Sequence, residues 1–114
     1  MTNQTLDDHR AKQFAVVGIG TDAVFGLRSN RAEANALARR FQMVKVVPPT
    51  VKKDFRVEKF SDQFKIVDVE FSTDVRYQKG GVRVTRPFKT VKKAMAFIRD
   101  ELGGNVVLCA SIGQ

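Results

Sequence analysis

The chain has 114 residues, 43% of them hydrophobic and 28% charged, and its formal net charge at pH 7 is +8. This balance excludes a wholly disordered basic tail, and the length is sufficient for one core without metals or disulfides. The single cysteine, Cys109, cannot form an internal disulfide. No apolar run reaches the roughly 20 residues of a membrane span, and the N-terminus lacks a signal-peptide pattern. We expect a protein of a reducing compartment, cytoplasmic or nucleoid/nuclear, and not secreted.

The first residues predict an arm and then a β-hairpin. Residues 1–11 are polar and are expected to form a flexible N-terminal arm, followed by a single domain over residues 12–114. Phe14–Ile19 and Ala23–Arg28 are apolar segments on either side of a Thr21-Asp22 turn, which predicts two paired strands.

A helix and a third strand follow. Asn30 and Glu33 have the spacing of a capping pair, which predicts a helix beginning at residue 31. The apolar positions recur with the helical period at Ala34, Leu37, Ala38 and Phe41. Met43–Val47 predicts a strand, ended by two prolines that cannot donate to a ladder.

The middle of the chain predicts a meander of strands. Phe55 and Val57 alternate with charged residues, and the strand Phe64–Phe71 follows a short turn. Asp68 and Glu70 are expected on the solvent face of that strand. Because they alternate with charged residues, five phenylalanines are expected in the interior: Phe14, Phe41, Phe55, Phe71 and Phe97. Phe60 and Phe64 lie at strand ends beside a turn and are weak candidates for exposure.

The charge is concentrated in one segment, Arg76–Arg99. It holds eight Lys and Arg residues and no Asp or Glu, whereas the rest of the chain holds twelve of each sign. Gly80-Gly81 predicts a tight hairpin turn between Val75–Lys79 and Val82–Arg86. Thr90 is the expected N-cap of a helix whose apolar positions are Val91, Ala94, Met95, Ile98 and Leu102, and Gly103-Gly104 ends this helix. The segment therefore predicts a basic hairpin joined to a helix with a basic outer face.

The two halves of the chain resemble each other, since each has the order hairpin, helix, strand. We predict an α+β fold of mostly antiparallel sheet, with about seven or eight short strands and two amphipathic helices. A pseudo-twofold repeat of a ββαβ unit, over residues 13–48 and 64–112, is an open alternative to a chance likeness of two short helices. The last strand is predicted at Val106–Ile112, and its pairing across an edge to form a homodimer is also left open.

Cations at this density neutralise phosphates, so the sequence predicts non-enzymatic nucleic-acid binding, with DNA slightly favoured over RNA and no cofactor. Tyr77 is expected to stack on a base, and the other residues to contact the backbone. The predicted site consists of Arg76, Tyr77, Lys79, Arg83, Arg86, Lys89, Lys92 and Lys93. A secondary basic surface is predicted from Arg28, Arg31 and Arg39.

The alternative is a protein-interaction module, such as a small inhibitor or assembly subunit, whose basic face docks on an acidic partner. Enzymatic readings fit the residues less well. A metal-dependent nuclease site built on Asp68 and Glu70 would add a further acid upstream and a lysine two residues after Glu70, but that position is Ser72. The only histidine, His9, lies in the predicted arm, so neither a histidine-based triad nor a zinc site can form.

The segment Gly18–Asp22, Gly-Ile-Gly-Thr-Asp, resembles the opening strand of the phosphopantetheinyl transferases, in which the aspartate binds magnesium. The resemblance implies that Asp22 is a metal ligand. The family's second acidic ligand, on a helix that contains Lys-Glu, has no counterpart here. A single aspartate cannot hold magnesium in a working site, so we interpret the segment as a turn between two strands.

Overall fold

The structure is a computed structural model that describes residues 10–107. These residues form two compact units, one of residues 10–52 with 101–103 and the other of residues 53–100 with 104–107. Both combine helix with mostly antiparallel sheet, which confirms the predicted α+β class. Most of the predicted N-terminal arm, His9, Cys109 and the greater part of the predicted last strand lie outside the described residues.

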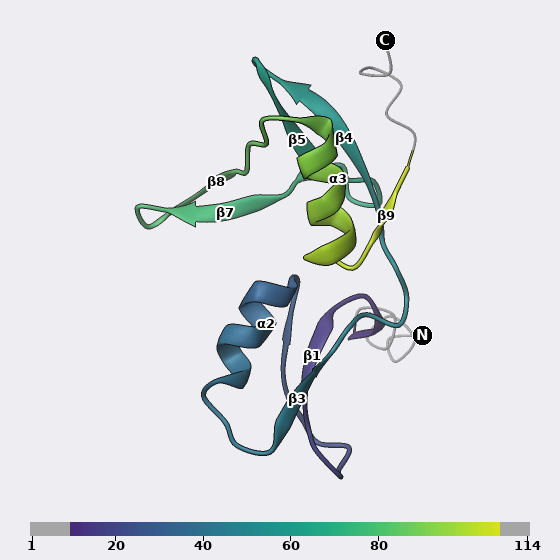
Figure 1. Cartoon of the computed structure of the whole chain (residues 1–114), viewed down its shortest axis with the longest axis vertical. Helices are drawn as coiled ribbons and strands as arrows, with labels where there is room; N and C mark the ends of the chain where they lie inside the picture. The colour runs from purple at the N-terminus through teal and green to yellow at the C-terminus, as the bar shows by residue number, and fades with distance from the viewer. Residues whose placement is uncertain (1–9, 108–114) are drawn as a thin grey trace. The chain divides into compact units, whose positions relative to one another are not determined.

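The first unit is a three-stranded antiparallel sheet that packs against one helix (Figure 1). Strand β1 (Phe14–Gly18) lies between β2 (Val24–Arg28) and β3 (Val44–Val47), and helix α2 (Arg31–Ala38) connects β2 to β3. The core of this unit forms between helix and sheet, and its buried members are Phe14, Val16, Ala34 and Leu37. The predicted hairpin, helix and strand are confirmed.

The capping of α2 is the one that the sequence predicts. The Asn30 side-chain oxygen accepts a hydrogen bond of 2.9 Å from the backbone N–H of Glu33, which satisfies a donor that the helix leaves free. Gly26 on β2 allows the helix to approach, because a Cβ atom at this position would collide with the side chain of Leu37. Local sequence thus determines both where α2 begins and how closely it packs.

The first turn of α2 has a further acceptor far along the chain. The backbone N–H of Arg31 donates to the carbonyl of Glu101 at 2.8 Å, and the N–H of Ala32 donates to Glu101 Oε1 at 3.1 Å. These bonds satisfy two more N–H groups at the start of the helix. Residues 101–103 therefore belong to the first unit although they lie near the end of the sequence.

The second unit is built on a four-stranded sheet of order β6-β5-β4-β9. Strands β4 (Asp54–Phe60), β5 (Gln63–Asp68) and β6 (Thr73–Asp74) pair antiparallel, and β9 (Asn105–Val106) pairs parallel to β4. Helix α3 (Val91–Asp100) packs against β4, β5 and β9. The core of this unit includes Phe55, Val57, Ile66, Ala94 and Ile98, all of which are buried.

Strands β7 (Arg76–Lys79) and β8 (Val82–Thr85) form a separate two-stranded sheet, drawn in green in Figure 1. Gly80 and Gly81 have φ angles of +59° and +83°, as the predicted two-residue turn requires. At the start of α3 the Thr90 hydroxyl accepts a 3.1 Å hydrogen bond from the N–H of Lys93, which confirms the predicted cap. The basic segment therefore folds as the hairpin and helix that its sequence predicts.

The order hairpin, helix, strand recurs in both units, but the strands do not pair in the same way. The order β5-β4-β9 repeats β2-β1-β3, with the strand that follows the helix placed beside the first strand of the unit. However, β9 runs parallel to β4 whereas β3 runs antiparallel to β1, and β6, β7 and β8 are inserted before α3.

Three side-chain predictions were wrong. Strand β5 ends at Asp68, and this residue is only 7% exposed and not on a solvent face, because it forms an ion pair with Lys53. Phe71 is 63% exposed because it lies beyond the end of the strand. Phe41 is 38% exposed because α2 ends at Ala38, and its ring makes an edge contact with Phe25.

We expect Ile98→Ala to destabilise the second unit by about 2–5 kcal/mol, since Ile98 lies on the buried face of α3 and its truncation leaves a cavity. Urea unfolding followed by circular dichroism would measure the loss. The control is Val82→Ala, at a side chain that is 61% exposed, which should change stability by no more than about 0.5 kcal/mol. Equal effects of the two variants would contradict the packing described here.

Candidate nucleic-acid interface

On the side of β5 that faces away from β4, the paired segment consists of residues 73–75 and Phe88. The β7–β8 hairpin lies between these two parts of the segment. Before the hairpin, the N–H of Val75 donates to the carbonyl of Ile66 at 2.8 Å. After it, Phe88 exchanges hydrogen bonds of 2.8 and 2.9 Å with Phe64. The N–H of Arg86 donates to the carbonyl of Val75 at 3.0 Å and closes the excursion. Residues 76–85, which we call the ribbon, therefore leave the sheet and return to it at one place.

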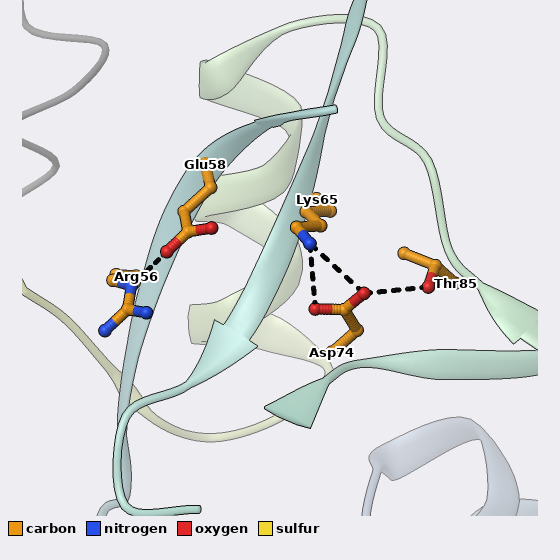
Figure 2. A network of polar contacts seen from close by, with 5 residues as sticks. All are labelled: Arg56, Glu58, Lys65, Asp74 and Thr85. Atoms are coloured by element: carbon orange, nitrogen blue, oxygen red, sulfur yellow. Dashed lines mark hydrogen bonds and ion pairs between the residues drawn. The ribbon is translucent and has the colours of Figure 1, made fainter. Parts of the chain in front are cut away.

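Asp74 fixes the base of the ribbon. Its two carboxylate oxygens lie 3.1 and 3.2 Å from Nζ of Lys65 on β5, and Oδ2 accepts a 2.9 Å hydrogen bond from the Thr85 hydroxyl on β8 (Figure 2). One carboxylate thus joins the last residue of the ribbon to the neighbouring strand of the sheet. Figure 2 also shows the ion pair between Arg56 and Glu58, both on β4.

The surroundings of Asp74 lower its pKa. Partial burial alone would raise the pKa of this carboxyl, but the hydrogen bonds from Lys65 and Thr85 and the positive charges of Lys65 and Arg76 bring it below its ordinary value. The carboxylate is therefore charged at neutral pH and contributes to the stability of the fold in that form.

Arg86 lies among three aromatic rings at the other side of the ribbon base. Its guanidinium carbon is 5.2 Å from the ring centre of Tyr77, 5.7 Å from that of Phe88 and 4.8 Å from that of Phe97 on α3. The rings of Phe88 and Phe97 are themselves 5.2 Å apart. Cation–π contacts of this kind hold β7 against α3, and they occupy one face of the Tyr77 ring. The structure thus gives Arg86 and Tyr77 a mutual contact that the sequence did not predict.

The register of the ribbon separates its side chains into two faces. Because residues opposite each other in an antiparallel pair point to the same side, Gln78 shares a face with Arg83, and Lys79 shares the other with Val82. The first face consists of Arg76, Gln78, Arg83 and Thr85, and the second of Tyr77, Lys79, Val82 and Val84. Arg76, Lys79 and Arg83 are all exposed, but they do not lie on one face.

The start of α3 adds three exposed lysines, Lys89, Lys92 and Lys93. The first turn of this helix contains no acidic residue. The partial positive charge of a helix N-terminus favours anions and disfavours cations, each by about 0.3–1 kcal/mol. Lysines at this end of the helix therefore raise the local positive potential at some cost to stability.

The predicted secondary basic residues belong to the first unit. Arg28 donates from Nη1 to the carbonyl of Leu27 at 2.7 Å and lines a shallow pocket with Glu33. The guanidinium of Arg31 lies 5.1 Å from the ring centre of Phe14, and Arg39 is exposed at the end of α2. Their union with the ribbon in one continuous surface stays a prediction.

The acidic residues considered as metal ligands have other surroundings. The Asp68 carboxylate pairs with Lys53, and its Oδ1 accepts hydrogen bonds of 2.9 and 3.3 Å from the N–H groups of Glu70 and Phe71. Asp22 is exposed in the turn before β2. Within residues 10–107, no three His, Cys, Asp or Glu side chains gather closely enough to hold a metal ion.

Comparisons of the chain with protein-family models, with curated proteins and with solved structures found no match. Neither α2 nor α3, the two helices described in full, is long and apolar enough to cross a membrane. Sequence reasoning missed two residues of the site, Asp74 and Gln78. The signal for Gln78 was available, since it lies at an alternate position opposite Arg83 once the Gly-Gly turn fixes the register.

We expect Asp74→Asn to destabilise the protein by about 1–2 kcal/mol at neutral pH, because it removes a charged acceptor that two side chains share. The pKa of Asp74 is lowered by folding, so its contribution is present above the ordinary carboxyl pKa and is lost as the pH falls through the lowered one. Urea unfolding of the wild type and of Asp74→Asn across an acid pH series should show that the difference between their free energies of unfolding decreases as the pH falls.

The matched control is Asp62→Asn, at an exposed residue in the turn between β4 and β5. It should have a smaller effect at neutral pH. A stability difference between Asp74→Asn and the wild type that stays constant down to the lowest pH would contradict the assigned role of the carboxylate.

We expect Arg86→Lys to weaken the attachment of the ribbon to α3, because lysine keeps the charge but loses the planar group that stacks on the rings. The expected loss of stability is about 1 kcal/mol, with faster amide hydrogen exchange in residues 76–85. Arg83→Lys, at an exposed position, should leave both unchanged. Indistinguishable exchange rates in the two variants would show that the stacking does not hold the ribbon.

Proposed function

We propose that the protein binds nucleic acid through the exposed cations of the ribbon and of the start of α3. The observation that carries this proposal is that Arg76–Arg99 presents exposed cations from two adjacent elements and contains no acidic residue. Surfaces that serve only solubility mix both signs of charge, whereas a field of one sign attracts a polyanion. Phosphate groups are the anions that such a surface binds by releasing counterions.

Two structural costs support the same conclusion. Three lysines stand near the N-terminus of α3, where the helix dipole disfavours them. The ribbon is a two-stranded sheet that Asp74 and Arg86 anchor at its base, whereas its end is exposed, and a hairpin with limited packing is marginally stable in water. A polyanionic ligand would offset both costs, because it neutralises the lysines and covers the ribbon.

In this proposal the exposed cations and the residues at the base of the ribbon have different roles. Arg76, Lys79 and Arg83 of the ribbon attract the nucleic acid from one element, and the three lysines at the start of α3 attract it from the other. Arg86 and Tyr77 orient the ribbon through their contact with each other and with Phe97. DNA remains slightly favoured over RNA as the partner.

We expect measurable binding to a nucleic acid at physiological salt, with a logarithmic salt dependence whose slope is about −0.9 for each phosphate engaged on a duplex. With about six cations in contact, the slope is about −5. Fluorescence anisotropy with single- and double-stranded DNA and RNA across a salt series would measure it. The double variant Arg83→Glu with Lys92→Glu should abolish binding, because it reverses one charge on each element.

The matched control is Lys45→Glu with Lys52→Glu, which changes the net charge equally at two exposed lysines of the first unit. It should retain most of the affinity. Absence of binding to all four nucleic acids at physiological salt would overturn the proposal, and the basic segment would then be examined as a docking face for an acidic protein.

A further inference from the structure

The first face of the ribbon carries a pair of side chains that is suited to more than phosphate contact. Gln78 and Arg83 lie directly opposite each other near the end of the hairpin, and both are exposed. Within residues 10–107 neither side chain has a hydrogen-bond or ion-pair partner. Their donors and acceptors are therefore available to a ligand that meets this face.

The dimensions of the ribbon fit one of the two grooves of duplex DNA. Its strands have four residues each, which gives a projecting length of about 13 Å at about 3.3 Å per residue, and they lie about 4.8 Å apart. The major groove of B-DNA is about 12 Å wide and admits a two-stranded ribbon, whereas the minor groove is about 6 Å wide. The ribbon is also a separate sheet from the four-stranded one, and residues 78–83 at its end are exposed.

The chemistry of the pair matches the edges of bases. The arginine fork donates two hydrogen bonds, to O6 and N7 of guanine. A glutamine amide accepts a hydrogen bond from N6 of adenine and donates one to N7. Gln78 is uncharged in a segment where eight residues are cationic, so it adds no charge to the attraction of phosphates. A donor and an acceptor on one side chain are what base recognition uses.

The second face argues against a single strand as the ligand. Proteins that bind single strands stack bases on exposed aromatic side chains. Tyr77 is the one aromatic residue of the ribbon, and Arg86 lies over one face of its ring at 5.2 Å. The ribbon therefore offers hydrogen-bonding groups and charges on its exposed positions, with little stacking surface.

We propose that the ribbon enters the major groove of duplex DNA and that Gln78 and Arg83 read base edges there. This inference rests on the proposed function, because the exposed cations supply the general affinity. Lys79, on the opposite face, and the lysines at the start of α3 contact the phosphates beside the groove. The protein is then a sequence-selective duplex binder and not a general DNA-coating protein.

The test is selection of preferred sites from a pool of random DNA duplexes by the full chain, followed by affinity measurements on the selected site and on a scrambled duplex. We expect the wild type to prefer the selected site. Its affinity should fall about tenfold or more when a base pair that Gln78 or Arg83 contacts is replaced. Gln78→Ala should remove the preference at one position and leave the salt slope unchanged. Arg83→Ala should remove it at a neighbouring position, again with little change in the salt slope.

Lys79→Ala is the matched control, since it removes one charge from the opposite face of the same ribbon. It should reduce the salt slope by about 0.9, because a phosphate contact is lost, and leave the preference for the selected site intact. Methylation of guanine N7, in the major groove, should interfere with binding, whereas methylation of adenine N3, in the minor groove, should not. Circular dichroism of each variant would verify that the fold is retained.

The outcomes separate this inference from the proposed function. Binding of duplex DNA with no preference, or a preference that survives Gln78→Ala and Arg83→Ala, would overturn base reading while phosphate binding stands. Tighter binding to single strands, or interference from adenine N3 alone, would overturn the major-groove placement. Absence of binding to any nucleic acid would overturn the proposed function, and this inference with it.

Discussion

The carboxylate of Asp74 is the group on which the arrangement of the basic surface depends. The ribbon has no core of its own, and an isolated two-stranded hairpin is marginal in water. Asp74 joins it to the sheet through Lys65 on one side and Thr85 on the other. Because three groups share this contact, and because Arg86 packs against α3 independently, the base of the ribbon has one orientation although its end is exposed to solvent.

Three ion pairs of the second unit use cations that lie outside the basic segment. Asp68 pairs with Lys53, Glu58 with Arg56 and Asp74 with Lys65, and all three of these cations precede the basic segment. Each of these pairs involves a residue of β4 or β5 or the position just before β4. The sheet thus carries ion pairs, and the ribbon and the start of α3 carry an excess of positive charge.

Features of the fold that depend on residues close in sequence could be predicted. The cap at Asn30, the turn at Gly80-Gly81 and the cap at Thr90 each involve residues within a few positions of one another, so the spacing of residue types is sufficient. Features that depend on distant partners could not. The burial of Asp68 requires Lys53, which lies on the far side of a hairpin in the sequence.

The same division applies to the candidate site. The basic residues were found from composition alone, because charge is visible without a structure. Their division into two faces requires the register of the hairpin, and the stacking of Arg86 requires a ring from α3. Gln78 could not be identified in this way, because its side chain is uncharged and does not contribute to the charge pattern. The direction of β9, parallel to β4, also follows only from the three-dimensional path of the chain.

The excursion of the ribbon has a consequence for how this surface can vary. Val75 and Arg86 are joined by a backbone hydrogen bond of 3.0 Å, so the ends of the ribbon meet at one point on the sheet. A segment with adjoining ends can be lengthened, exchanged or removed with little disturbance to the scaffold that carries it. The ribbon is thus a contiguous insertion whose length and side chains can change while the strand order of the sheet that carries it is kept.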